Sequence, residues 1–108
     1  MGSTGSAGAA EVLAGGPLEE ALARLPGWSV EAGRLHKEFR FADFVVAFGF
    51  MSQVALVAER MNHHPEWSNV WSRVVVDLST HDAGGITRKD LELARAMDAL
   101  ASPLSAGG

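Results

Sequence analysis

Hydrophobic positions follow a helical spacing over the longest patterned stretch of the chain, residues 42–63. Apolar side chains recur there every three or four residues, which predicts one long amphipathic helix. The stripe consists of Phe44, Phe48, Met51, Ala55, Ala58 and Met61, supported by Val45, Val54 and Val57. The residue before a proline avoids helical geometry, so Pro65 is expected to end the helix with His63 in its final turn and His64 at its exit.

Shorter patterns lie on both sides of this helix. Residues 17–25 begin with a proline and carry leucines on one face, which predicts a short helix. Residues 28–41 predict two strands joined at Ala32-Gly33, because apolar and polar side chains alternate after that turn. Alternation from residue 69 to residue 81 predicts one or two further strands.

A capping motif opens the last predicted helix. Thr87 and Asp90 have the spacing of a capping box, and the helix is expected to continue to about residue 101. The order of elements is then helix, two strands, long helix, one or two strands, helix. This order indicates an α+β domain with its helices on one face of an antiparallel sheet.

The first sixteen residues are dominated by glycine, alanine and serine. Such a segment cannot bury enough apolar surface to offset the entropy of ordering it, so we predict a flexible leader at 1–16 and a single domain at 17–104. Met1-Gly2 followed by Ser6 also fits the loose pattern for N-myristoylation, and we interpret it as part of the leader. A core this small leaves surface that a second copy can cover, so a homo-oligomer is expected.

Composition and charge exclude several classes of function. The net charge is −4, from nine basic and thirteen acidic residues, and the basic residues are scattered, so nucleic acid is not expected as a direct partner. The absence of cysteine excludes disulfides, thiolate chemistry and cysteine-ligated zinc. No apolar stretch approaches the roughly 20 residues that span a bilayer, and no secretory signal is recognisable. We therefore expect a soluble, cytoplasmic protein without a membrane partner.

Three of the four histidines lie next to predicted element boundaries, where side chains commonly line clefts. They are His63, His64 and His81. Histidine can give and take protons near neutral pH, which suits acid/base catalysis. Glu59 precedes His63 by four residues, so it is expected on the same helical face, where its charge favours a protonated imidazole that can act as an acid. His81 is then a candidate for the complementary base.

Two other interpretations of these histidines stay open. Histidines at a helix end often only hydrogen-bond the last carbonyl groups, and a histidine at a strand end needs no function. Glu59, His63 and His81 are also suitable zinc ligands, with Asp77 as an extra candidate. No second histidine or carboxylate at helical spacing supplies the usual local set of three ligands, so a metal-free site is favoured.

The spacing of these residues resembles a known signature. Glu59-x-x-x-His63-His64-Pro65, an aromatic at Trp71, then His81 and Asp90 match the pterin-4a-carbinolamine dehydratases. Longer strings match as well: FGFMSQVAL at 48–56, HHPEW at 63–67, NVW at 69–71 and LSTHDAGGIT at 78–87. The likeness extends from about Trp28 to Leu100 and leaves out the leader.

The resemblance implies a hydro-lyase. Enzymes of this family dehydrate 4a-hydroxytetrahydrobiopterin, or a similar pterin 4a-carbinolamine, to the quinonoid dihydropterin, which serves tetrahydrobiopterin recycling for aromatic amino-acid hydroxylases. They need neither a metal nor an organic cofactor. The family fold is a four-stranded antiparallel sheet with three helices packed on one face, assembled into dimers or tetramers.

Site residues follow from the resemblance position by position. His63 and His81 match the acid/base residues, His64 contributes to substrate binding and assists, and Glu59 orients or polarises His63. The family's substrate-contacting segments correspond here to Asn62, His63, His64, Ser79, Thr80, His81 and Asp82.

Other matched positions have alternatives. Asp90 matches the family's late aspartate, although a helix cap explains it equally well. Trp67 could pack on the pterin or on the core, and the core is favoured. Pro65 is a further candidate within the same motif. Asn62 stands where relatives often have aspartate, and Trp71 stands where they often have tyrosine, but neither replaces a proposed proton-transfer residue.

A binding protein is the competing class of function. Animal relatives also bind a homeodomain transcription factor as a dimerisation cofactor, through the helical surface by which they self-associate. The predicted helix at 42–63 could present such a surface. A purely regulatory protein would not need the three histidines, so an enzyme is favoured.

Overall fold

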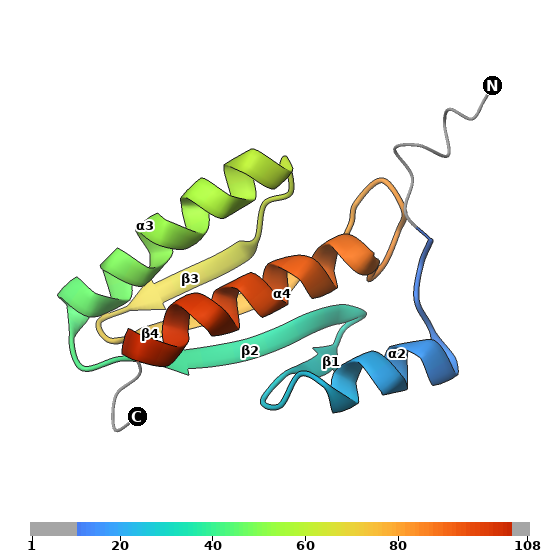
Figure 1. Ribbon diagram of the computed structural model, residues 1–108, viewed down its shortest axis with the longest axis horizontal. Helices are drawn as coiled ribbons and strands as arrows, with labels where there is room; N and C mark the ends of the chain where they lie inside the picture. Colours follow the sequence, from blue (N-terminus) through green and yellow to red (C-terminus); the bar gives the residue numbers. More distant parts are fainter. Residues whose placement is uncertain (1–10, 105–108) are drawn as a thin grey trace.

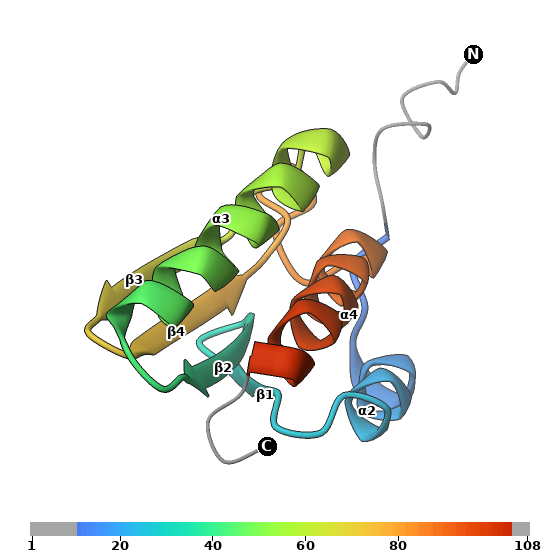
Figure 2. The ribbon, with the colours of Figure 1, turned by 60° about the vertical axis from the view of Figure 1, so that its left-hand side comes forward.

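The computed structural model describes residues 11–104 of the chain. Its elements in chain order are α2 (Gly15–Ala23), β1 (Ser29–Glu31), β2 (Arg34–Arg40), α3 (Phe44–Met61), β3 (Glu66–Val70), β4 (Arg73–Leu78), α4 (Arg88–Ala101) and the 3-10 turn η1 (Ser102–Leu104). The strands form one antiparallel sheet in the order β1-β2-β4-β3. The three helices lie on the same side of this sheet (Figures 1 and 2), which confirms the predicted α+β fold.

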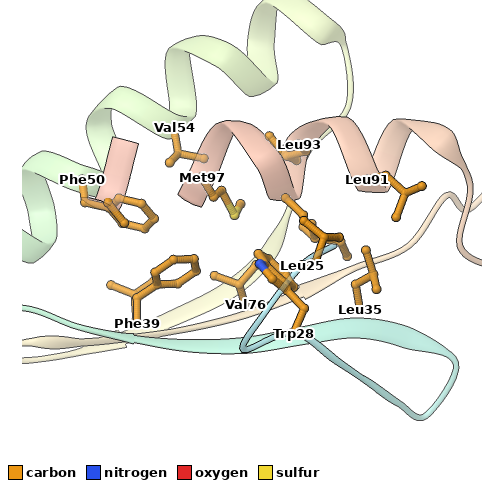
Figure 3. Packing of buried hydrophobic residues seen from close by; sticks show 14 of the residues in the cluster. Leu25, Trp28, Leu35, Phe39, Phe50, Val54, Val76, Leu91, Leu93 and Met97 are labelled. Atoms are coloured by element: carbon orange, nitrogen blue, oxygen red, sulfur yellow. The ribbon is translucent and has the colours of Figure 1, made fainter. Parts of the chain in front are cut away.

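The hydrophobic core fills the space between the sheet and the helices (Figure 3). β2 and β4 point alternate side chains toward the helices, because successive side chains of a strand face opposite sides. Opposite them, α3 and α4 each bury one face. The fully buried core side chains are Leu35, Ala47, Phe50, Val54, Val74, Val76, Leu93, Ala94 and Met97. This core fixes the ends of the sheet and helices relative to one another.

The alternating segment at 69–81 is interrupted by a turn. β3 begins earlier than predicted, at Glu66, and the chain reverses at Trp71, whose φ of 52° places it in the left-handed region. Non-glycine residues adopt this conformation uncommonly, so the sequence carries no turn signal there. Val70, the last residue before the turn, is 61% exposed. The single alternating stretch is therefore a β3–β4 hairpin.

α3 is shorter than the predicted helix at both ends. Its first turn is capped by Asp43, whose Oδ1 accepts a hydrogen bond from the backbone N–H of Val46 at 2.9 Å. At the other end Asn62 adopts a left-handed conformation with a φ of 52° and closes the helix. Asparagine tolerates this conformation better than most residues, so Asn62 ends the helix before the proline does. His63 consequently lies beyond the helix, contrary to the prediction.

The outer face of α3 is apolar. Phe44, Val45, Phe48 and Leu56 are 50–77% exposed. With 18 residues and a mean hydropathy of 1.4, α3 is long and apolar enough by length and composition to cross a membrane, so the expectation that no such stretch exists was wrong. Because the inner face of α3 packs into the domain core, we interpret α3 as a core helix with an apolar outer surface.

Part of the predicted leader belongs to the domain. The backbone N–H of Leu13 donates a 2.8 Å hydrogen bond to the carbonyl of Ile86, and Leu13 packs against the core. Gly15 and Gly16 form the start of α2. The boundary predicted at residue 17 therefore falls too late. Residues 1–10, including the candidate myristoylation pattern, lie outside the described residues.

Candidate active site

One cavity lies where the C-terminal end of α3, the start of β3 and the end of β4 come together. Its volume is about 350 Å³. The antiparallel pairing of β3 with β4 places Glu66 opposite Asp77, so the segment before β3 and the segment after β4 are neighbours. The cavity is lined by Asn62, His63, His64, Pro65, Glu66, Ser79, Thr80, His81, Asp82 and Lys89. Every residue of the two segments expected to contact substrate is among them.

His63 is held by a buried carboxylate. Its Nε2 lies 2.6 Å from Oδ1 of Asp90, and the two residues are 8% and 0% exposed. The other oxygen, Oδ2, accepts hydrogen bonds from the hydroxyl of Thr80 at 2.8 Å and from the backbone N–H of Thr87 at 2.9 Å. Because Oδ2 already accepts from two donors, Oδ1 is the Asp90 oxygen that faces Nε2 of His63. Nδ1 remains as the ring nitrogen available to a substrate.

Asp90 is the helix cap that its spacing predicted, and it also contacts His63. It is the third helical residue of α4 and completes the capping box with Thr87. The same carboxylate binds His63 across the domain, and the hydroxyls of Thr80 and Thr87 lie 2.7 Å apart beside it. A buried charge is tolerated only when its hydrogen bonds are satisfied, and this network satisfies both oxygens.

Glu59 binds His64 and not His63. Its Oε1 lies 2.9 Å from Nε2 of His64, and both side chains are exposed. The predicted pairing with His63 assumed that the helix runs through His63. Because Asn62 breaks the helical geometry, the four-residue spacing does not bring His63 over Glu59. The expectation that Glu59 orients His63 was therefore wrong. The carboxylate that contacts His63 is that of Asp90.

His81 approaches the cavity from the end of β4. Its side chain is 80% exposed, and its Nε2 lies 3.5 Å from Oε2 of Glu66. Glu66 also forms an ion pair with Arg34 of β2. Each of the three cavity histidines thus has a different carboxylate next to its Nε2.

The candidate zinc ligands are not grouped together in the described part of the chain. Asp77 binds Nδ1 of His36 at 2.8 Å on the sheet face opposite the helices, so it is not available to His63. Within residues 11–104, no three histidine, aspartate or glutamate side chains are grouped so that they could hold a metal ion. Trp67 packs against the hydrophobic core and is absent from the cavity wall.

Sequence reasoning overlooked three features of the site. Glu66 forms part of the HHPEW motif but was not predicted as a site residue, although it lies between His81 and Arg34. Lys89 lines the cavity from the first turn of α4, and Thr87 supports Asp90 through its backbone. Two signals in the sequence pointed to this network: the capping box, which placed Asp90 at the start of α4, and the match of Asp90 to the family's late aspartate.

The fold and the cavity define the class of protein: an α+β domain that gathers three histidines at one end of an antiparallel sheet. The family model for pterin 4 alpha carbinolamine dehydratase matches residues 12–100. The chain therefore belongs to this family, and the resemblance in its motifs is confirmed.

Relatives of high identity have the same family name. The chain is 58% identical over 85 residues to a protein of Solibacter usitatus named as a candidate pterin-4-alpha-carbinolamine dehydratase, covering 79% of this chain and 90% of that protein. It is also 58% identical over 87 residues to a protein of Rhodopseudomonas palustris with the same name, covering 79% and 86% of the two chains.

Two solved structures resemble this one. A transcriptional coactivator/pterin dehydratase from Brucella melitensis superposes with a TM-score of 0.82 and 46% identity, covering 84% of this chain and 99% of that one. A pterin dehydratase-like RuBisCO assembly factor of the alpha-carboxysome superposes with a TM-score of 0.57 and 23% identity, covering 68% and 86% of the two chains. The second likeness concerns the fold alone.

Proposed function

We propose that this protein dehydrates 4a-hydroxytetrahydrobiopterin, or a similar pterin 4a-carbinolamine, to the quinonoid dihydropterin. One observation carries the proposal: His63 and His81, far apart in the sequence, line one cavity in a chain of the dehydratase family. The proposed site consists of His63, His64 and His81 with Glu59, and the reaction needs no metal or organic cofactor. Cytoplasmic tetrahydrobiopterin recycling is the proposed role.

The chemistry requires two proton transfers. The bond from C4a to the hydroxyl oxygen breaks as that oxygen receives a proton and leaves as water. The proton on the neighbouring N5 is removed, and its electron pair completes the double bond between C4a and N5. Two imidazoles placed on either side of this bond can carry out both transfers, and such general acid/base catalysis contributes roughly 10²–10⁴-fold.

His63 is the better placed general acid. The buried Asp90 carboxylate, 2.6 Å from its Nε2, fixes the ring, so that Nδ1 can deliver a proton to the departing hydroxyl. His81, which is largely exposed, is the proposed base that accepts the proton of N5. Glu59 contacts His64, and both side chains are exposed. We propose that this pair binds and orients the substrate.

The remaining cavity residues suit a polar heterocycle. The Thr80 hydroxyl is committed to Asp90, so Thr80 contributes by fixing that carboxylate. The same cavity is lined by Asn62, Ser79 and Asp82, which can offer amide, hydroxyl and carboxylate groups to the edge of a pterin.

We propose that the exposed apolar face of α3 associates with other copies to form a homo-oligomer. Phe44, Val45, Phe48 and Leu56 lie on this face, and exposed apolar patches commonly mark interaction sites. The same face supports the second candidate function, a dimerisation cofactor that binds a transcription factor. A relative of known structure is described as a transcriptional coactivator as well as a pterin dehydratase.

A stopped-flow assay with freshly made 4a-hydroxytetrahydropterin tests the enzymatic proposal. Wild-type protein should accelerate dehydration strongly, and H63A and H81A should each lose most of that acceleration. H36A is the matched control, because His36 lies on the sheet face opposite the helices and contacts Asp77. Wild-type protein that leaves the uncatalysed rate unchanged would favour the binding function, and a stoichiometric metal ion in the active protein would contradict the metal-free mechanism.

A further inference from the structure

Glu66 and His81 belong to a wall between two cavities. Next to the cavity of about 350 Å³ lies a second one of about 400 Å³, which reaches toward the β1–β2 turn and the loop after β4. The residues common to both are Glu66, Ser79, Thr80 and His81. His81 thus stands between two open spaces and is not packed into a protein interior.

The Glu66 carboxylate contacts two different partners through its two oxygens. Oε2 lies 3.5 Å from Nε2 of His81, and Oε1 forms an ion pair with Nη1 of Arg34. Arg34 is the first residue of β2 and Glu66 the first residue of β3, while β4 runs between these strands. The Arg34–Glu66 pair therefore spans the end of β4, just before the chain continues to His81.

The side chain of His81 is less restrained by its surroundings than that of His63. His63 is 8% exposed and fixed by a 2.6 Å hydrogen bond, whereas the side chain of His81 is 80% exposed. An exposed side chain samples several rotamers, and a displacement of a reacting group by about 1 Å can reduce a rate by about 10²-fold. A base in this position is effective only if its ring is restrained.

We propose that Glu66 is the positioning residue of His81 and that Arg34 holds Glu66 in place. This inference rests on the proposed function, in which His81 is the base. The Glu66 carboxylate lies 3.5 Å from Nε2 of His81 and restrains that side of the ring, which leaves Nδ1 for the substrate. Arg34 occupies the other carboxylate oxygen and so limits the rotation of the Glu66 side chain.

The restraint itself can be measured without any substrate. The order parameter of the Cε1–H bond of His81, from ¹³C relaxation of histidine-labelled protein, should fall in E66A and to a smaller extent in R34M, while that of His63 stays unchanged. E38A is the matched control, because Glu38 forms an ion pair with Arg40 at 2.6 Å at the other end of β2. An unchanged His81 order parameter in E66A overturns the proposal.

Kinetics separate a positioning role from a structural one. E66A should lower kcat about tenfold or more with KM within about threefold of wild type, because Glu66 acts on His81 and not on the substrate. E66Q should recover part of kcat, since its amide oxygen can still accept from Nε2. The exchange R34E/E66R should restore the ion pair and the unfolding midpoint but not kcat, because no carboxylate then faces His81.

The outcomes distinguish this proposal from the proposed function. If wild-type protein does not dehydrate the pterin but E66A mobilises His81, the positioning role stands and the proposed reaction fails. If wild-type protein is active but E66A keeps its kcat, or if the charge exchange restores kcat, Glu66 does not position His81 and only this proposal fails.

Discussion

Nε2 of His63 and Oδ1 of Asp90 lie 2.6 Å apart, and this contact joins the loop after α3 to the first turn of α4. The two residues are 27 positions apart in the sequence. Because Asp90 also completes the capping box of α4, the carboxylate that stabilises the start of the last helix also fixes the orientation of a cavity histidine. Folding of α4 and assembly of the site are therefore coupled.

Replacing Asp90 with asparagine should inactivate the site while the fold persists. The amide can keep the acceptor oxygen toward Thr80 and Thr87, but its NH₂ group then faces Nε2 of His63 and forces the proton to Nδ1. We expect kcat for dehydration to fall by about 10²-fold or more, as acid/base catalysis through His63 is lost. D98N is the matched control on the same helix, because Asp98 binds Trp28 and Lys37 away from the cavity. Equal activity losses in D90N and D98N would contradict a specific role for Asp90.

Removing the Thr80 hydroxyl should weaken the support of Asp90. T80V keeps the shape of the side chain but leaves Oδ2 of Asp90 with one donor fewer in a buried setting, which costs about 1–3 kcal/mol of unfolding free energy. T80S retains the hydroxyl and should remain closer to wild type. Urea unfolding monitored by tryptophan fluorescence measures both variants. A T80V variant as stable as wild type would show that the network contributes little to the fold.

Glu59 should matter much less to catalysis than Asp90. Its contact is with His64, and the pair is exposed, so E59Q should change KM more than kcat and leave the unfolding midpoint unaffected. Steady-state kinetics of E59Q and D90N test whether the loss of kcat is smaller in E59Q. A larger loss of kcat in E59Q than in D90N would restore the pairing of Glu59 with His63 that the sequence predicted.

A charge on the outer face of α3 should separate the copies of this chain. F48E places a carboxylate at a position that is 57% exposed and flanked by other apolar side chains. We expect light scattering after size exclusion to give a monomer for F48E and an oligomer for wild type. A99E, at an exposed position of α4, should leave the oligomer intact. An unchanged mass for F48E would remove this face from the proposed interface.

The sequence predicted the type and order of the main elements because their hydrophobic periods are regular. It missed the turn at Trp71 because no glycine or asparagine marks that left-handed position. The end of α3 was placed too late for a similar reason. Proline was read as the stop signal, although Asn62 closes the helix three residues earlier.

The candidate site was predicted as a set of residues but not as a set of pairs. The motif spacing predicted the histidines and both loop segments as site residues, and the structure places them around one cavity. The partner of each histidine depends on where the chain leaves a helix or strand, which spacing alone does not encode. This is why Glu59 was assigned to His63, and why Glu66 and Arg34 were overlooked.

A crystal structure with a stable pterin that lacks the 4a-hydroxyl group, such as a dihydropterin, would test the central claim most directly. The account predicts the ring within the cavity, with C4a and N5 about 3–3.5 Å from Nδ1 of His63 and Nδ1 of His81. A pterin bound elsewhere, or one that contacts only one of these imidazoles, would contradict it.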